Sequence, residues 1–133
     1  MKIIAFLVLL ISSVCFGQTN YQSLDTIKAP AKYDNVYVRP LYSDSSEVSS
    51  FVIFIRTEVK SHKHVDHAEH VIVLTGIGMM TLGEKKFKIM KGDVIYIPKS
   101  TFHSVQSISK KEPLKVLSIQ ALYFDGKDRV FKE

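Results

Sequence analysis

The sequence predicts an all-β protein built of short antiparallel strands, arranged as a sandwich or a barrel. Runs of β-branched and aromatic residues alternate with Gly, Asp and Pro turns at intervals of about 8–12 residues. No stretch of about 11 or more residues keeps the apolar period of an amphipathic helix. A length of 133 residues, 46% hydrophobic and 23% charged, fits one compact domain. We therefore expect a single β domain with little helix.

The first residues are expected to lie outside this domain. Lys2 is followed by an apolar run from Ile3 to Val14, and a small residue, Gly17, closes the segment. This pattern is typical of a secretory signal peptide with cleavage after Gly17. We expect residues 1–17 to be removed and the protein to be exported, either to a periplasm or out of the cell.

Two alternatives to a removed leader remain open. A membrane anchor is disfavoured, because the run is shorter than the roughly 18–20 apolar residues that span a bilayer. Acylation of Cys15 in a lipoprotein is disfavoured as well, because the residues before it fit such a site poorly. Cys15 is also the only cysteine, so the domain itself has neither a disulfide nor a thiolate ligand. Any metal must be held by histidine and carboxylate.

Residues 18–35 are expected to form an extended N-terminal arm, and residues 36–133 the β-barrel domain. The arm mixes polar residues with Pro30 and keeps no sustained period. It is rich in Tyr and Ile for a tail, so we expect it to pack across the barrel or against a second subunit. A homodimer would cover edge strands that a small sandwich otherwise exposes.

The barrel domain is expected to begin with a strand from Val36 that ends at Pro40, because proline cannot donate to a strand ladder. A Ser/Asp/Glu-rich loop over residues 42–50 follows. The later strands, each bounded by turn residues, are expected at residues 51–59, 69–75, 79–82, 86–90, 94–98, 103–108 and 114–124.

The charge pattern argues against a nucleic-acid partner. The formal net charge of +5 comes from 18 Lys+Arg against 13 Asp+Glu. These cations are spread along the chain, whereas a nucleic-acid binder clusters them with stacking aromatics on one face. We expect a small-molecule ligand or substrate, no nucleic acid and no stable membrane span.

The histidines carry the chemistry that the sequence offers. Four of the five lie between residues 62 and 70, and the fifth is His103. Residues two apart on a strand share a face, so His62 and His64 can point at one spot. With Glu69 at the start of the next strand and the distant His103, they form a ligand set that suits one divalent ion such as Fe, Mn, Ni or Zn. A merely solvated histidine-rich loop would explain the cluster but not the positions of Glu69 and His103.

His67 and His70 are expected to play a lesser part. His67 lies in the loop between the two strands, and His70 has the wrong parity relative to Glu69 if the strand has begun there. Both are expected at the rim of the site or behind its ligands.

These spacings resemble the two motifs of the cupin superfamily. In the first, one residue separates His62 from His64, four separate His64 from Glu69, and six more precede Gly76. In the second, Gly92 is followed after five residues by Pro98 and then by His103. The resemblance covers residues 62–103.

Three turn positions depart from the family pattern. Arg56 stands where the first motif opens with glycine, Ser100 at the middle glycine of the second motif, and Ser107 at its closing asparagine. These departures put loop detail in doubt, because they are backbone and turn positions and not ligand positions.

The resemblance implies a jelly-roll barrel of six to eight antiparallel strands with a metal inside its mouth. The implied ligands are His62, His64, Glu69 and His103. Only residues 77–91 separate the motifs, which is similar to compact, single-domain members. Family members perform dioxygenation, decarboxylation, sugar-acid isomerisation or lyase chemistry, and some only bind ligands, so the fold does not choose among them.

Three kinds of protein therefore remain open. The first is a metal-dependent enzyme acting on an oxygen-rich small molecule such as a sugar acid or a phenolic. The second is a module that binds or senses such a molecule without turnover, and the third is a structural protein. The last is disfavoured, because structural metal sites are usually closed and contain cysteine.

The candidate catalytic residues beside the metal are Arg56, Tyr96 and Gln120. Arg56 could pair with a substrate carboxylate if its strand runs regularly to the histidines, and its alternative role is a surface charge. Tyr96 could equally fill the barrel. Gln120 and Ser118 alternate with apolar residues, so they face either the cavity or solvent.

Overall fold

A computed structural model describes residues 21–43 and 47–133, and in it the chain is almost entirely β-structure. The predicted signal peptide, its cleavage site and Cys15 lie outside the described residues. Within those ranges the only helix is the three-residue η1 (Leu24–Thr26), and no helix there could cross a membrane. The strands are β1 (Val36–Ser43), β2 (Val48–Ile55), β3 (Glu58–His64), β4 (Ala68–Thr75), β5 (Ile77–Leu82), β6 (Lys85–Met90), β7 (Val94–Ile97), β8 (His103–Ser107), β9 (Leu114–Ala121) and β10 (Arg129–Phe131).

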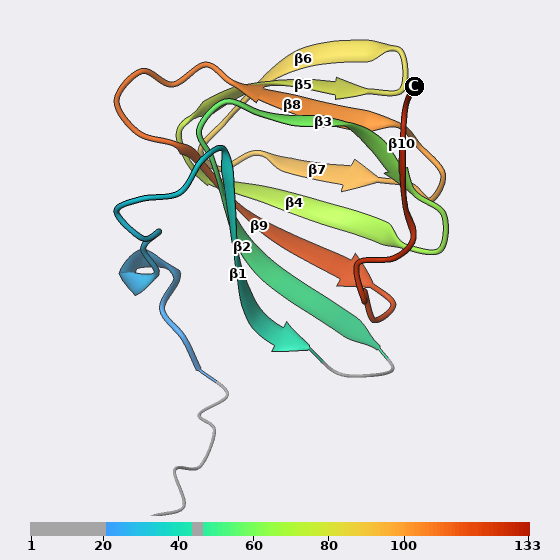
Figure 1. The fold of residues 1–133 in the computed structure, drawn as a ribbon, viewed down its shortest axis with the longest axis horizontal. Helices are drawn as coiled ribbons and strands as arrows, with labels where there is room; N and C mark the ends of the chain where they lie inside the picture. The colour runs from blue at the N-terminus through green and yellow to red at the C-terminus, as the bar shows by residue number, and fades with distance from the viewer. Residues whose placement is uncertain (1–20, 44–46) are drawn as a thin grey trace, which may run out of the picture.

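The strands form two five-stranded antiparallel sheets, in the orders β1-β2-β9-β4-β7 and β10-β3-β8-β5-β6. Figure 1 shows the second sheet in the upper part of the view and the first sheet running below it to β1. The chain passes repeatedly from one sheet to the other, as in a jelly roll. The predicted antiparallel, all-β fold is confirmed, with ten strands in the described part of the chain where the resemblance implied six to eight.

The core lies between the sheets and draws on both of them. The alternation of buried and exposed residues along the strands directs one set of apolar side chains inward. The buried cluster comprises Ile55, Val71, Val73, Met80, Ile89, Ile95, Ile97, Leu114 and Val116. This continuous apolar layer holds the two sheets together around the site described below.

The predicted strand over residues 51–59 is in fact two strands. The ladder is interrupted at Arg56 and Thr57, where the chain leaves the first sheet and enters the second. The Asn35 side chain stabilises this crossing, because its Oδ1 accepts hydrogen bonds from the backbone nitrogens of Thr57 (3.1 Å) and Glu58 (3.0 Å). The interruption breaks the side-chain parity between Arg56 and the histidines of β3.

Pro40 does not end its strand, contrary to the prediction. β1 continues to Ser43 with a register shift between Pro40 and Tyr42. β1 is an edge strand, where a missing N–H donor is tolerated.

The described part of the N-terminal arm packs across the barrel. The Lys115 ammonium, on β9, donates to the carbonyls of Leu24 at 2.6 Å and Ile27 at 3.0 Å. Arg56 Nη1 donates to the carbonyl of Tyr33 at 2.8 Å, and the guanidinium lies 4.0 Å from the centre of the Tyr33 ring. The arm is thereby tied to the barrel by cations binding backbone oxygens.

Candidate metal centre

Strands β3 and β8 bring three histidines to one point between the sheets. His62 and His64 are two residues apart on β3, so their side chains leave it on the same side. His62 is paired in register with His103 of β8. One nitrogen from each of the three rings lies within 4.8 Å of the other two. All three side chains are buried.

Glu69 faces these histidines from β4 in the opposite sheet. Its Oε2 lies 3.8 Å from His64 Nε2 and 3.5 Å from His103 Nε2. Its other oxygen, Oε1, accepts a hydrogen bond of 2.5 Å from the hydroxyl of Ser118, which is fully buried on β9. Ser118 therefore holds one carboxylate oxygen and leaves the other directed at the imidazoles.

The outer nitrogen of two of the rings is fixed by a backbone carbonyl. Nδ1 of His62 lies 2.8 Å from the carbonyl oxygen of Lys60, and Nδ1 of His103 lies 3.0 Å from that of Thr101. A carbonyl oxygen can only accept, so each Nδ1 carries the hydrogen and donates it. The Nε2 atoms therefore keep their lone pairs, which a metal ion requires.

Asp128 performs the same task for the third ring. Its Oδ1 accepts from His64 Nδ1 at 3.0 Å, and its Oδ2 accepts from the backbone nitrogen of Asp66 at 3.0 Å. Sequence reasoning missed Asp128, which is 64 residues from His64 in the chain and belongs to neither spacing motif. Only the pairing of β10 with β3, which places Arg129 opposite His64, brings it there.

His67 lies behind His64 and shares the Asp128 carboxylate. Its Nδ1 bonds Asp128 Oδ2, and its Nε2 lies 2.6 Å from the carbonyl oxygen of Tyr123. Both partners only accept, so both ring nitrogens donate and the ring is an imidazolium. Burial lowers the pKa of His67, but the hydrogen bonds to Asp128 and Tyr123 outweigh it and raise the pKa overall. His67 is therefore a cation that supports the site from outside.

The pKa of Asp128, the ionic partner of His67, is shifted in the opposite direction. Burial raises the pKa of Asp128, but hydrogen bonds from His67 and His64 outweigh it and lower the pKa to about 2. Asp128 is thus a carboxylate that bridges two histidines and ties the C-terminal segment to the loop after β3.

Burial also decides the charge of His62. Removal from water lowers its pKa to about 4, with further lowering by His103, Arg129 and His64, against the opposing hydrogen bond to Lys60. His62 is therefore neutral at pH 7. A neutral imidazole is the form that binds a metal.

Glu69 is ionised at the same pH. Burial raises its pKa, but the hydrogen bond from Ser118 and the neighbouring imidazoles of His103 and His64 outweigh that effect and lower it. The site thus combines the neutral imidazole of His62 with an ionised carboxylate.

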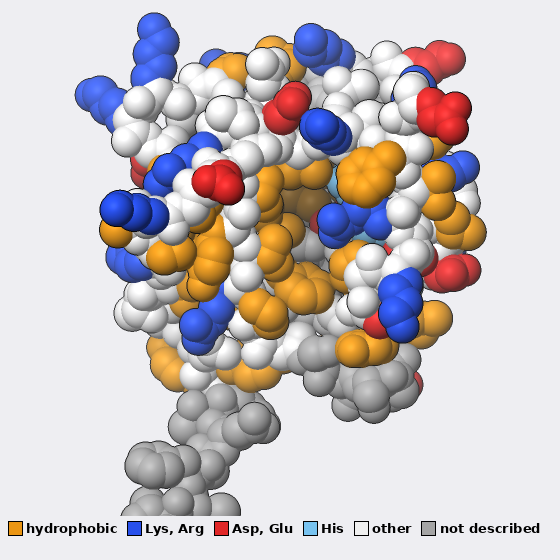
Figure 2. All heavy atoms as spheres, viewed as in Figure 1, with side chains coloured by type: hydrophobic (Ala, Val, Ile, Leu, Met, Phe, Trp, Pro, Cys, Tyr) orange, Lys and Arg blue, Asp and Glu red, His pale blue; other side chains and the backbone are white. Residues whose placement is uncertain are grey.

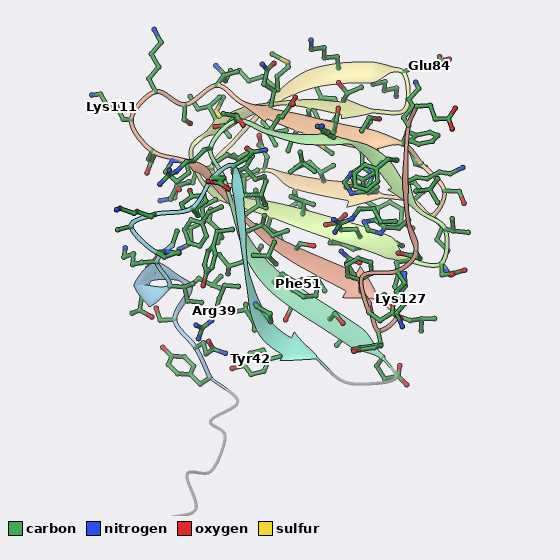
Figure 3. All side chains as sticks on the ribbon, viewed as in Figure 1. Arg39, Tyr42, Phe51, Glu84, Lys111 and Lys127 are labelled. Carbon is green, nitrogen blue, oxygen red and sulfur yellow. The ribbon has the colours of Figure 1, made fainter. Side chains whose placement is uncertain are left out.

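Aromatic rings pack against the outer side of this cluster. The Phe124 ring centre lies 5.0 Å from that of His64 and 5.4 Å from that of His67, and Phe51 of β2 packs edge-on against Phe124 at 6.2 Å. In Figure 3, Phe51 lies on β2 and Lys127 marks the nearby C-terminal segment, at the end of the barrel opposite the loop of Lys111. These rings exclude water from the back of the site.

The histidines open into a cavity of about 290 Å³ between the sheets. Figure 2 shows a hollow in this face of the molecule, surrounded by hydrophobic side chains. The aliphatic and aromatic residues that line it are Val36, Val38, Ile53, Ile55, Val59, Val71, Met80, Ile89, Ile97, Val105, Leu114, Val116 and Phe131.

Gln120 is the candidate residue that the structure places in this cavity. It is 3% exposed and lines the cavity on β9, paired in register with Glu69 of β4. Its Oε1 has no hydrogen-bond partner among the described residues. The sequence left the direction of Gln120 open, and the register with Glu69 decides it.

Arg56 and Tyr96 do not line this cavity. Arg56 is exposed and holds the arm, because the strand break removes it from the face of β3 that carries the histidines. Tyr96 is 54% exposed on β7 and packs against the exposed His70 on the outside of the first sheet, with ring centres 5.1 Å apart.

The predicted homodimer would cover such exposed apolar groups, and it stays a prediction.

The chain matches one family model and is similar to several known proteins. The cupin domain family model matches residues 55–120. An uncharacterized protein of Methanocaldococcus jannaschii is 32% identical over 99 residues, which are 70% of this chain and 78% of that protein. A mannose-1-phosphate guanylyltransferase of Salmonella typhimurium is 32% identical over 69 residues, which are 52% of this chain and only 14% of that enzyme.

The fold is also similar to solved structures. An uncharacterized conserved protein with a double-stranded beta-helix domain, from Klebsiella pneumoniae, superposes with a TM-score of 0.73 at 18% sequence identity. The superposition covers 87% of this chain and 93% of that one. Nearly the whole barrel is therefore shared.

Proposed function

Since this chain belongs to the cupin family, we propose that it binds one divalent metal ion through His62, His64, Glu69 and His103 and acts on a small molecule held in the adjoining cavity. One observation carries the proposal. The Nδ1–H of each of the three imidazoles donates to an oxygen outside the cluster, so the Nε2 lone pairs are directed toward one point. A carboxylate oxygen faces that point from the other sheet.

The donor set fits a divalent ion. Ligand atoms about 2.1 Å from one ion lie roughly 3–4 Å apart, and the described spacings are 3.5 Å and 3.8 Å to Glu69 and at most 4.8 Å among the histidines. Small ring movements would bring all four onto one ion. Nitrogen and oxygen donors without cysteine suit Fe, Mn, Ni or Zn.

The proposed chemistry depends on the side of the metal site that the four protein ligands leave open. A bound ion would supply a Lewis acid with one or two coordination positions free for an oxygen of the ligand. Gln120 would orient that ligand by a hydrogen bond, and the apolar walls would keep water away from it. The proposed activities are dioxygenation, isomerisation or lyase chemistry.

A second candidate is a binding or sensing protein without turnover. The observation that favours it is the scarcity of acid–base groups: Glu58, Lys60 and Arg129 are exposed where they line the cavity, and the only buried titratable groups lining it are the four proposed ligands. Turnover that disappears when the ligands are replaced would exclude this candidate.

Export is part of the proposal. The apolar run after Lys2 and the small residues before Gln18 support a leader that is cleaved during export. N-terminal sequencing of the protein recovered outside the cytoplasm of expressing cells is expected to begin at Gln18. A chain that retains Met1 there would contradict it.

Asp128→Asn is expected to weaken metal binding by about 10–100-fold, which is the usual effect of losing a partner that orients a ligand. The amide keeps the shape of Asp128 but not its charge, and only one of its two polar atoms can accept. His64 then loses the carboxylate that fixes its tautomer. Competition titration of the metal-free protein with zinc measures the change.

Asp125→Asn is the matched control. Asp125 lies in the same segment and caps the backbone nitrogen of Lys127 at 2.9 Å, with no bond to a histidine. Its replacement is expected to leave the zinc affinity unchanged. Equal losses in both variants, or none in Asp128→Asn, would contradict the role given to Asp128.

A further inference from the structure

We infer that the molecule held in the cavity is a hydroxyaromatic compound, a small phenol, with its hydroxyl at the histidine end and its ring against the aliphatic walls. This inference rests on the proposed function and narrows its substrate class, since a polyhydroxylated sugar acid would be the other oxygen-rich choice. Three features of the cavity carry it.

The first feature is the chemistry of the walls. Beside the histidines, the cavity is lined by buried aliphatic side chains from both sheets, such as Val71, Met80 and Val116. The backbone groups of β2, β4 and β9 are engaged in strand ladders. A sugar acid carries a hydroxyl on nearly every carbon, and these would lose water without finding partners. An aromatic ring has no hydrogen bonds to water to lose there, and it buries its whole surface.

The second feature is the unpaired side-chain oxygen of Gln120. Buried polar atoms almost always have a partner, yet Gln120 Oε1 has none among the described residues. Gln120 lies in register between Glu69 of β4 and Ser49 of β2, at the histidine end of the cavity. A carboxamide oxygen accepts, so it calls for a ligand that donates. A single hydroxyl placed at this end satisfies it.

The third feature is where the charges lie. Glu58, Lys60 and Arg129 line the cavity but are exposed, so they stand at its mouth. They are joined there by apolar groups, Val38 at 45% exposure and Phe131 at 55%. The cavity therefore has no buried cationic side chain in its lining to pair with the carboxylate of a sugar acid. Its volume, about 290 Å³, is near the lower limit of ligand sites and suits a molecule with one ring.

Calorimetric titration of the zinc-loaded protein with 4-ethylphenol and with D-gluconate tests the class of ligand. The phenol is expected to bind at least about tenfold more tightly, which corresponds to about 1.4 kcal/mol. Gluconate binding as tightly as the phenol, or more tightly, would overturn the inference.

The role of Gln120 is tested with a ligand that lacks the hydroxyl hydrogen. The wild type is expected to prefer 4-ethylphenol over 4-ethylanisole by about fivefold, as for one hydrogen bond. Gln120→Leu, with Gln120→Met as a second variant should the first not fold, is expected to abolish this preference. Gln106→Leu, which changes an exposed glutamine of β8, should keep it. A preference that survives in the Gln120 variants would contradict the assignment.

The zinc content, measured before each titration, separates this inference from the proposed function. If zinc is not retained, the metal-binding proposal fails, and the same titrations on the metal-free protein decide the inference, because the walls and Gln120 do not depend on the ion. If zinc is retained and gluconate is preferred, only the inference fails.

Discussion

Replacing His64 and His103 together by alanine is expected to reduce bound metal from about one equivalent per chain to none, because metal binding depends on a complete ligand set. The variant removes one imidazole from β3 and one from β8, and the remaining His62 and Glu69 come from different sheets. Elemental analysis after loading with Fe, Mn, Ni or Zn and exhaustive dialysis measures the loss.

His70→Ala is the control for this variant. His70 belongs to the same histidine-rich stretch, but it is exposed and packs against Tyr96 on the outside of the first sheet. It should retain the full metal content. If the double variant keeps its metal while His70→Ala loses it, the stretch is a surface chelator and the buried site is wrong.

The identity of the retained ion directs the search for an activity. Iron, nickel or manganese points first to oxygen chemistry, and zinc points to isomerisation, lyase chemistry or plain binding. The phenol inferred above is compatible with either outcome, since it rests on the walls and on Gln120.

Gly76→Ala is expected to lower the free energy of unfolding by about 2–5 kcal/mol. Gly76 has φ +82° at the passage from β4 to β5, and a Cβ there would lie 2.8 Å from the Cα of Leu114 and 3.0 Å from the carbonyl oxygen of Pro113. The left-handed conformation costs roughly 1–2 kcal/mol, and overpacking against backbone adds about 1–3 kcal/mol. Urea unfolding of the metal-free protein measures the sum.

Gly83→Ala separates these two causes. Gly83 also has a positive φ, +59°, but no atom lies within 4 Å of a Cβ built on it. Only the conformational cost of roughly 1–2 kcal/mol remains. Equal losses at the two glycines would show that the close approach of Gly76 to Leu114 does not matter.

The part of the site that follows local periodicity could be predicted from the sequence. The two-residue spacing of His62 and His64 sets their shared face on any strand. Glu69 and His103 required the two spacing motifs, because they reach the histidines of β3 from other strands. The structure brings the three histidines together and places Glu69 beside His64 and His103, with the separations given above.

The features of the site that could not be predicted from the sequence depend on tertiary structure. Arg56 follows a β-rich run without a turn residue. The end of the strand shows only in the structure, where Asn35 Oδ1 accepts hydrogen bonds from the backbone nitrogens of Thr57 and Glu58. Asp128 lies in a segment without hydrophobic periodicity, and its role depends on the pairing of the three-residue β10 with β3. The direction of Gln120 depended on register, because alternation fixes which residues share a face but not which face is inside.

The anomalous scattering of crystals of the metal-loaded wild-type protein, recorded at the absorption edge of the bound element, tests the central claim most directly. The account predicts one peak per chain, bonded to the Nε2 atoms of His62, His64 and His103 and to Oε2 of Glu69. A peak held by His67 or His70, or metal-replete crystals with no peak among the four proposed ligands, would contradict it.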